Sequence, residues 1–258
     1  MKAVILAAGY ATRLRPLTDE VPKQLLPVGG RPILDWILDK LDGVPGLEGI
    51  HVVTNSHYAA RFRRWADERG GVAVHDDGTS TNEDRRGAIG DLAFTIDEAG
   101  LGDDLLVIAG DNLFGFALPD FVAFWRGKGV ASAVAVHDVR DFALARQYGI
   151  VELGNDDRVL GFVEKPAEPQ STLAATAMYL YHRDHVRLIG EYLAQGNPRD
   201  QPGNLVAWLH RREPVYAYRF EGEWFDIGDL GQLLVADNRM RERVGLPQRD
   251  GYALSLQN

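Results

Sequence analysis

Residues 2–18 read KAVILAAGYATRLRPLT, an apolar run that leads through small residues into two arginines. We interpret Ala3–Ala7 as a buried strand that ends in a turn around a single glycine. Arg13 and Arg15 follow the turn, and Lys23 comes soon after. Small residues after a first parallel strand let backbone N–H groups approach a phosphate chain. The three cations therefore predict that an anion binds at this turn.

Further apolar runs alternate with segments of helical spacing. These runs are short and mostly not alternating, which is typical of strands buried on both faces, and they cover 50–54, 72–75, 105–109 and 130–136. Helices are predicted after Pro32, over 88–99 and over 120–127. Strand and helix in alternation predict an α/β fold with a mostly parallel central sheet flanked by helices on both faces.

The pattern changes after about residue 140. Apolar runs over 148–153 and 159–163 flank the turn-forming residues 154–157 and predict an inserted antiparallel hairpin. Two further strands and two helices are expected over 174–181, 215–220, 184–195 and 204–211. A closing helix is expected from Asp229 to about Val244 because its apolar residues fall on one face.

The chain contains no clear linker, and we expect one domain over 1–258. Within it we expect a nucleotide-binding half over 1–140, a sugar-binding half over 141–228 and a helical tail over 229–258; the two substrate labels depend on the resemblance given below.

Composition excludes several classes of protein. The 258 residues include no cysteine, so the chain has no disulfide framework or thiolate metal site, and we expect a cytoplasmic protein. No stretch approaches the roughly 20 apolar residues of a membrane helix, so no membrane partner is expected. Acidic residues number 37 against 28 basic ones, and this balance argues against nucleic acid as a partner. A small phosphorylated ligand needs only a few local cations.

Two well-known phosphate motifs are absent from the sequence. It has no G-x-x-x-x-G-K-S/T loop and no G-x-G-x-x-G fingerprint after the first strand, which weakens the hypothesis of a nicotinamide-dependent oxidoreductase. Two aspartates are the candidates for a metal site. Asp111 comes just past the strand predicted over 105–109, where open α/β sheets bind ligands, and Asp226 lies in WFDIG at 224–228. Singly each is typical of a turn residue, but together they suit Mg²⁺.

Residues 6–41 resemble the sugar-1-phosphate nucleotidyltransferases, and most closely the short glucose-1-phosphate thymidylyltransferases. The resemblance rests on LAAG at 6–9, TRL at 12–14, PLT at 16–18 and PKQLLPV at 22–28, and it continues in islands to about residue 230. It implies a Rossmann-like nucleotidyltransferase fold with an inserted antiparallel sugar-binding portion. It also implies an Mg²⁺-dependent enzyme that joins a nucleoside triphosphate, above all dTTP or UTP, to glucose-1-phosphate and releases pyrophosphate.

The resemblance assigns a role to each matching residue. On the triphosphate side it implies contacts from the turn and from two cations, namely Leu6, Ala8, Gly9, Arg13 and Lys23. It gives the metal to Asp111 and Asp226 and places Gly87 under the base. On the acceptor side it implies that Gly149 packs on the sugar, that Glu164 binds sugar hydroxyls and that Lys165 binds the sugar phosphate.

The sequence departs from the family at several positions. Ala11 stands where the family has glycine, and Thr176 and Ala177 stand where relatives have asparagine and then glycine. The glutamine that thymidylyltransferases place before Gly87 is not evident, and residues 81–82 are similar to those of some cytidylyltransferases. A cytidylyltransferase acting on a sugar-like or small alcohol phosphate therefore remains an alternative, as does a non-catalytic nucleotide or sugar-phosphate sensor.

Two further expectations concern assembly and histidines. Many relatives are dimers or tetramers, so the resemblance implies a homo-oligomer. His182 and His185 are three positions apart at a strand-to-helix junction, and we interpret them as a surface pair rather than a metal site.

Overall fold

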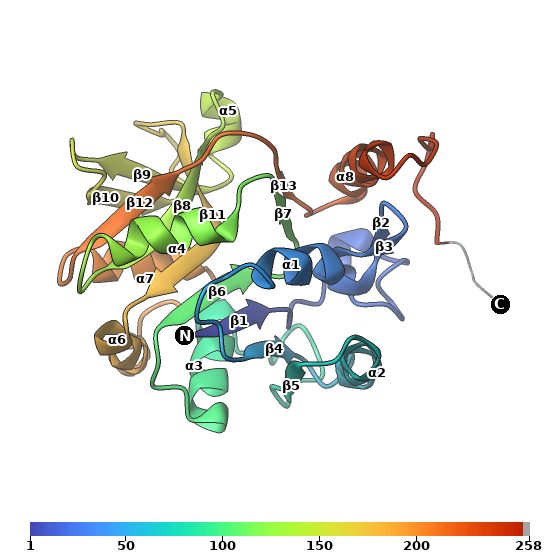
Figure 1. The fold of residues 1–258 in the computed structure, drawn as a ribbon, viewed down its shortest axis with the longest axis horizontal. Helices are drawn as coiled ribbons and strands as arrows, with labels where there is room; N and C mark the ends of the chain where they lie inside the picture. Colours follow the sequence, from blue (N-terminus) through green and yellow to red (C-terminus); the bar gives the residue numbers. More distant parts are fainter. Residues whose placement is uncertain (255–258) are drawn as a thin grey trace.

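A computed structural model describes residues 1–254, so residues 255–258 of the predicted tail lie outside the described part. The main sheet has nine strands (Figure 1). Seven of them follow the order β10–β9–β11–β6–β1–β4–β5, while β8 pairs with β11 and β12 pairs with β8. Their bounds are β1 (Lys2–Leu6), β4 (Ile50–Thr54), β5 (Val72–Asp76), β6 (Leu105–Ala109), β8 (Ser132–Asp138), β9 (Gly149–Leu153), β10 (Val159–Glu164), β11 (Leu173–Tyr181) and β12 (Val215–Arg219).

The first half of the chain forms the parallel part of this sheet. Strand β1 pairs with β4 and β6 in parallel, and β4 pairs in the same way with β5. The predicted α/β fold with a mostly parallel central sheet is therefore confirmed. Strand β11 runs antiparallel to β6 and carries the sheet into the second half of the chain.

Helices cover both faces of the sheet, because the strand residues are apolar on both sides. In β1, Ala3 and Ile5 belong to one core and Val4 to the other. The first core is closed by α1 (Ile33–Leu41), α2 (Ala59–Arg69), α4 (Leu118–Arg126) and α8 (Leu230–Arg243). The second is closed by α3 (Ala88–Ala99), α6 (Arg183–Ala194) and α7 (Pro202–Leu209). Figure 1 shows α1 and α3 on opposite sides of β1.

The second half carries the predicted antiparallel insertion. Strands β9 and β10 form a hairpin, and a short helix, α5 (Phe142–Ala145), precedes it. Two small sheets were not predicted, because their strands have only two or three residues each. They are formed by β2 (Pro27–Val28) with β3 (Arg31–Pro32), and by β7 (Asn112–Phe114) with β13 (Trp224–Asp226). None of the helices within residues 1–254 has the length and apolar character needed to cross a bilayer.

Candidate active site

A cavity of about 500 Å³ opens at the carboxyl ends of β1 and β6, which are neighbouring parallel strands. This is the edge of the sheet at which α/β proteins bind ligands. Nearly all the site residues expected from the sequence line the cavity, namely Leu6, Ala8, Gly9, Lys23, Gly87, Asp111, Gly149, Glu164, Lys165 and Asp226. Residues that are distant in the sequence therefore line the same cavity.

The small β7–β13 sheet brings the two aspartates together. Asp111 immediately precedes β7, and in the antiparallel register Asp226 lies opposite Asn112. The backbone N–H of Ile227 donates to the carbonyl of Asp111 over 3.2 Å. Burial and the neighbouring charge of Asp111 raise the pKa of the Asp226 carboxyl, while nearby cations oppose this shift. Two carboxylates thus share a confined, partly buried position.

Asn112 links Asp111 to Trp224 on the cavity side of the small β7–β13 sheet. Its amide nitrogen donates to Asp111 Oδ1 over 2.9 Å, and its amide oxygen accepts from Trp224 Nε1 over 2.6 Å. Because Asn112 is buried, both ends of its amide are held, and the orientation of the Asp111 carboxylate follows. Asn112 was not among the predicted site residues, although its position next to Asp111 was a usable signal.

Two cations approach the carboxylates from the amino-terminal segment. Lys23 Nζ donates to Asp111 Oδ2 over 2.5 Å and to the carbonyl of Ile227 over 2.8 Å. Arg13 is exposed and does not line the cavity, but a Cβ placed on Gly228 would lie 3.6 Å from its Nη2 atom. Arg13 also lowers the pKa of Asp226, so its charge reaches the same position.

Glu164 and Phe162 are held between two glycines at the other end of the cavity. A Cβ on Gly149 would lie 2.9 Å from Glu164 Oε2, and a Cβ on Gly203 would overlap the same atom. Burial raises the pKa of the Glu164 carboxyl, and the neighbouring Lys165 opposes this. Gly203 was missed by the sequence analysis, because nothing local to a glycine in the first turn of α7 indicates a partner in β10.

The backbone bends sharply where the chain lines the cavity. Ala11 has φ 45°, Lys165 has φ 47° and Ala177 has φ 54°. Ala177 lies in a break of register between β11 and β8, and the hydroxyl of Thr176 there donates to the carbonyl of Ala135 over 2.9 Å. Bulges of this kind redirect side chains next to binding sites.

Gly87 marks a third region of the cavity wall, at the start of α3. Its φ is 79°, and a Cβ there would lie 2.6 Å from both the carbonyl oxygen of Arg199 and Asp200 Oδ1. The segment 199–203 therefore packs directly on this turn, and residues 200–203 line the cavity. This contact between distant segments was not predicted.

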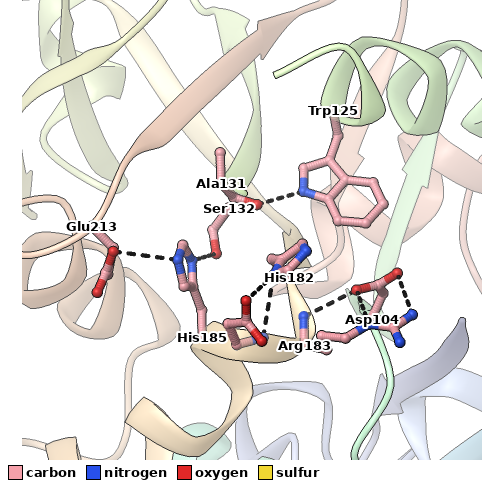
Figure 2. A network of polar contacts seen from close by, with 9 residues as sticks. Asp104, Trp125, Ala131, Ser132, His182, Arg183, His185 and Glu213 are labelled. Atoms are coloured by element: carbon pink, nitrogen blue, oxygen red, sulfur yellow. Dashed lines mark hydrogen bonds and ion pairs between the residues drawn. The ribbon is translucent and has the colours of Figure 1, made fainter. Parts of the chain in front are cut away.

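The two histidines at the start of α6 are not a surface pair, and the sequence interpretation was wrong on this point. His185 is buried, and its Nδ1 lies 2.9 Å from Ser132 Oγ (Figure 2). Its Nε2 lies 3.5 Å from a carboxylate oxygen of Glu213. The serine is also buried, so this arrangement connects β8 to α6 and offers no substrate access. In the part of the chain that the structure describes, no group of three or more potential metal-ligating histidines or carboxylates occurs.

Comparisons with protein families and with known proteins all find nucleotidyl transferases. The model of the family described as nucleotidyl transferase matches residues 2–243. The UTP–glucose-1-phosphate uridylyltransferase AglF of Haloferax volcanii is 32% identical over 95% of this chain and 98% of its own length. The UTP–glucose-1-phosphate uridylyltransferase of a Synechocystis species is 31% identical over 89% of this chain, which spans 61% of that protein.

A solved structure shares the fold. It is a Bacillus anthracis protein assigned as a glucose-1-phosphate thymidylyltransferase, in complex with a sucrose. The TM-score is 0.77 with 25% identity, and the match covers 94% of this chain and 96% of that one.

Proposed function

The chain belongs to the nucleotidyl transferase family, and we propose that it transfers a nucleotidyl group from UTP or dTTP to glucose-1-phosphate in an Mg²⁺-dependent reaction. The nucleotide and the sugar are suggested by the names of its relatives and of the solved structure. The observation that carries the proposal is the joining of Asp111, Asp226 and Lys23 in one cavity, although more than 100 positions separate the aspartates.

The residues present fit a magnesium ion. Mg²⁺ is bound through one or two carboxylates together with waters and substrate phosphate oxygens, rather than by an all-protein cage. Asp111 and Asp226 supply two carboxylates. Burial and then the charge of Asp111 raise the pKa of Asp226, so a bound cation would favour its ionised form. These two side chains would hold the ion, which would neutralise charge on the phosphates and orient them.

The reaction needs no nucleophile from the protein. An oxygen of the sugar-1-phosphate attacks the α-phosphorus, a new P–O bond forms, and the bond to the bridging oxygen of the pyrophosphate breaks. Catalysis then consists of positioning and of stabilising the charge that moves onto the leaving pyrophosphate. We assign the turn at Ala8 and Gly9 and the side chains of Arg13 and Lys23 to the triphosphate.

The acceptor is assigned to the end of the cavity formed by the β9–β10 hairpin. Lys165 would bind the sugar phosphate, and the Glu164 carboxylate, held between Gly149 and Gly203, would accept hydrogen bonds from sugar hydroxyls. The fixed position of Glu164 favours this role, because an acceptor that is already ordered loses little entropy on binding. Since nucleoside triphosphates are cytoplasmic, a cytoplasmic location goes with this function.

The proposal is tested by measuring pyrophosphate release with pairs of substrates. UTP, dTTP, CTP, ATP and GTP are each combined with glucose-1-phosphate, with other sugar-1-phosphates and with phosphocholine, with and without Mg²⁺. We expect release only when a triphosphate and glucose-1-phosphate are both present, with UTP or dTTP best. Release with CTP and phosphocholine alone would support the cytidylyltransferase alternative, and triphosphate binding without release from any pair would support a sensor.

A further inference from the structure

Asp91, on the first turn of α3, is a buried acid that the residues described so far leave without a role. Its side chain lines the cavity, the residue is 6% exposed, and its Oδ1 atom is enclosed with no partner within residues 1–254. An ionised carboxylate in this position would be costly, because burial removes most of its hydration and its Oδ1 atom has no donor among the described residues. Neither the resemblance nor the chemistry proposed above gives this residue a role.

Asp77, which follows β5, explains how Asp91 is accommodated. The carboxylate of Asp77 accepts from the backbone N–H of Thr79 over 2.7 Å and from its hydroxyl over 2.8 Å. These two hydrogen bonds fix the position of the Asp77 side chain. Burial, together with the charge and side-chain hydrogen bond of Asp77, raises the pKa of Asp91 to about 8.

The other charged groups around Asp91 have smaller effects on its pKa. Arg86, which precedes α3, lowers it, and Asp200, which precedes α7, raises it. With a pKa of about 8, Asp91 is mostly protonated at neutral pH, and Asp77 is its side-chain hydrogen-bond partner. A protonated carboxyl has one carbonyl oxygen, and because Asp91 lines the cavity, this oxygen can accept a hydrogen bond from an N–H or O–H group of a ligand.

The position of α3 indicates which part of a nucleotide would contact the Asp91 side chain. Helix α3 packs on β1 and β4, so its first turn lies beside the turn that follows β1. The backbone N–H of Asp91 donates to the carbonyl of Gly87 over 2.8 Å, which places Asp91 directly behind that glycine. In the proposed function the triphosphate binds at the turn after β1, and the sugar-1-phosphate binds at Glu164 and Lys165. The nucleoside then extends toward Gly87 and Asp91.

We propose that Asp91 is a specificity-determining residue whose carbonyl oxygen accepts a hydrogen bond from the N3–H group of uracil or thymine. This inference rests on the proposed function, in which UTP or dTTP is the donor substrate. Uracil and thymine carry a proton on N3, whereas cytosine carries a lone pair there. An acceptor fixed opposite N3 favours the first two bases, because the cytosine ring would leave two acceptors facing each other.

Calorimetric binding at pH 7 tests this inference without requiring turnover. Wild type, Asp91→Leu and Thr95→Val are each titrated with UTP, CTP and inorganic tripolyphosphate, which has no base. We expect Asp91→Leu to weaken UTP binding by about tenfold, the cost of one lost hydrogen bond, with little effect on CTP and tripolyphosphate. Thr95→Val is the matched control: it removes a buried hydroxyl from the same helix that donates to the Asp91 carbonyl over 2.7 Å.

A second variant separates the acceptor from the charge. Asp91→Asn keeps a carbonyl oxygen for the base and an N–H₂ group for Asp77, so it should restore most of the UTP affinity that Asp91→Leu loses. An equal loss for UTP and CTP, a loss confined to CTP, an equal loss for tripolyphosphate, or no UTP binding by the wild type would each overturn the inference. Asp91-dependent UTP binding without pyrophosphate release would instead overturn the proposed transfer and leave the inference standing.

Discussion

Three residues of the cavity wall hold a left-handed backbone conformation although they are not glycine. Ala11, Lys165 and Ala177 have φ angles of 45°, 47° and 54°. This conformation costs a residue with a Cβ about 1–2 kcal/mol. Ala11 and Ala177 stand where the resembling family has glycine. The backbone at both positions therefore has a conformation that suits glycine, although the residue is alanine. Strain of this kind is concentrated at functional sites.

Replacing Ala11 with glycine tests this interpretation of the turn. We expect Ala11→Gly to leave the free energy of unfolding unchanged or to raise it by up to about 1 kcal/mol, because the relief of strain outweighs the added entropy of the unfolded chain. Ala93→Gly, in the interior of α3, is the control and should lose about 1 kcal/mol. Urea denaturation measures both, and an equal loss in the two variants would argue against a left-handed Ala11.

Single residues were predictable to different degrees. Lys23, Asp111 and Lys165 were indicated by motifs that lie within a few positions of them. Gly203 packs against Glu164, and Asp91 interacts with Asp77, so their environments depend on contacts between segments that no local pattern contains. For the same reason His185 was assigned to the surface, since its partner Ser132 lies in a distant strand.

At the scale of elements, the β7–β13 sheet decides the geometry of the site. Each strand has only three residues, too few for a periodic pattern, and so the sequence indicated two separate turns instead. The long buried strands and α3 were predicted well, because their apolar runs and flanking glycines are strong local signals. Helix α2 was not predicted, although Phe62, Trp65 and Ala66 have helical spacing among charged residues.

The junction of β8 and α6 is expected to make stability depend on pH. Burial lowers the pKa of His185 below its ordinary value of 6.5, so the unfolded chain binds a proton there more readily than the folded one. The stability that neutral His185 supports is present above about pH 6.5 and is lost as the pH falls below it. In His185→Gln, which retains a hydrogen-bonding side chain, the fall in melting temperature between pH 7 and pH 5 should be smaller than in the wild type.

An exposed histidine provides the control for that measurement. His57→Gln, at the loop before α2, should keep the wild-type pH dependence of the melting temperature. If His185→Gln and His57→Gln follow the same curve as the wild type, the buried contact with Ser132 does not contribute to acid sensitivity.

At the scale of the whole molecule, the sheet joins two halves that each supply part of the site. The parallel strands position the turn after β1 and Asp111, while the antiparallel part supplies Glu164 and Lys165, and β13 returns with Asp226. The overall α/β architecture was predictable because burial on both faces leaves a distinct hydrophobic pattern. The closure of the site was not, since it depends on how the second half folds back onto the first.

Substitution of Asp226 tests the central claim that Asp111 and Asp226 together hold the metal for nucleotidyl transfer. Asp226→Asn keeps the shape of the side chain and removes its charge. Partial burial and the neighbouring charge of Asp111 both disfavour the ionised form of Asp226, so the melting temperature of the variant should stay the same or rise. Turnover should fall by about two to three orders of magnitude, and added Mg²⁺ should restore part of it. Glu223→Gln, three positions before Asp226 and outside the cavity, is the control and should keep its rate.

The most direct measurement is Mg²⁺-dependent pyrophosphate release, recorded together with the melting temperature on the same preparation of Asp226→Asn. We expect a folded protein of undiminished thermal stability that has lost most of its turnover and responds to added Mg²⁺. A variant that is less stable but releases pyrophosphate at the wild-type rate per folded molecule would contradict the claim, because Asp226 would then be a structural residue beside Trp224.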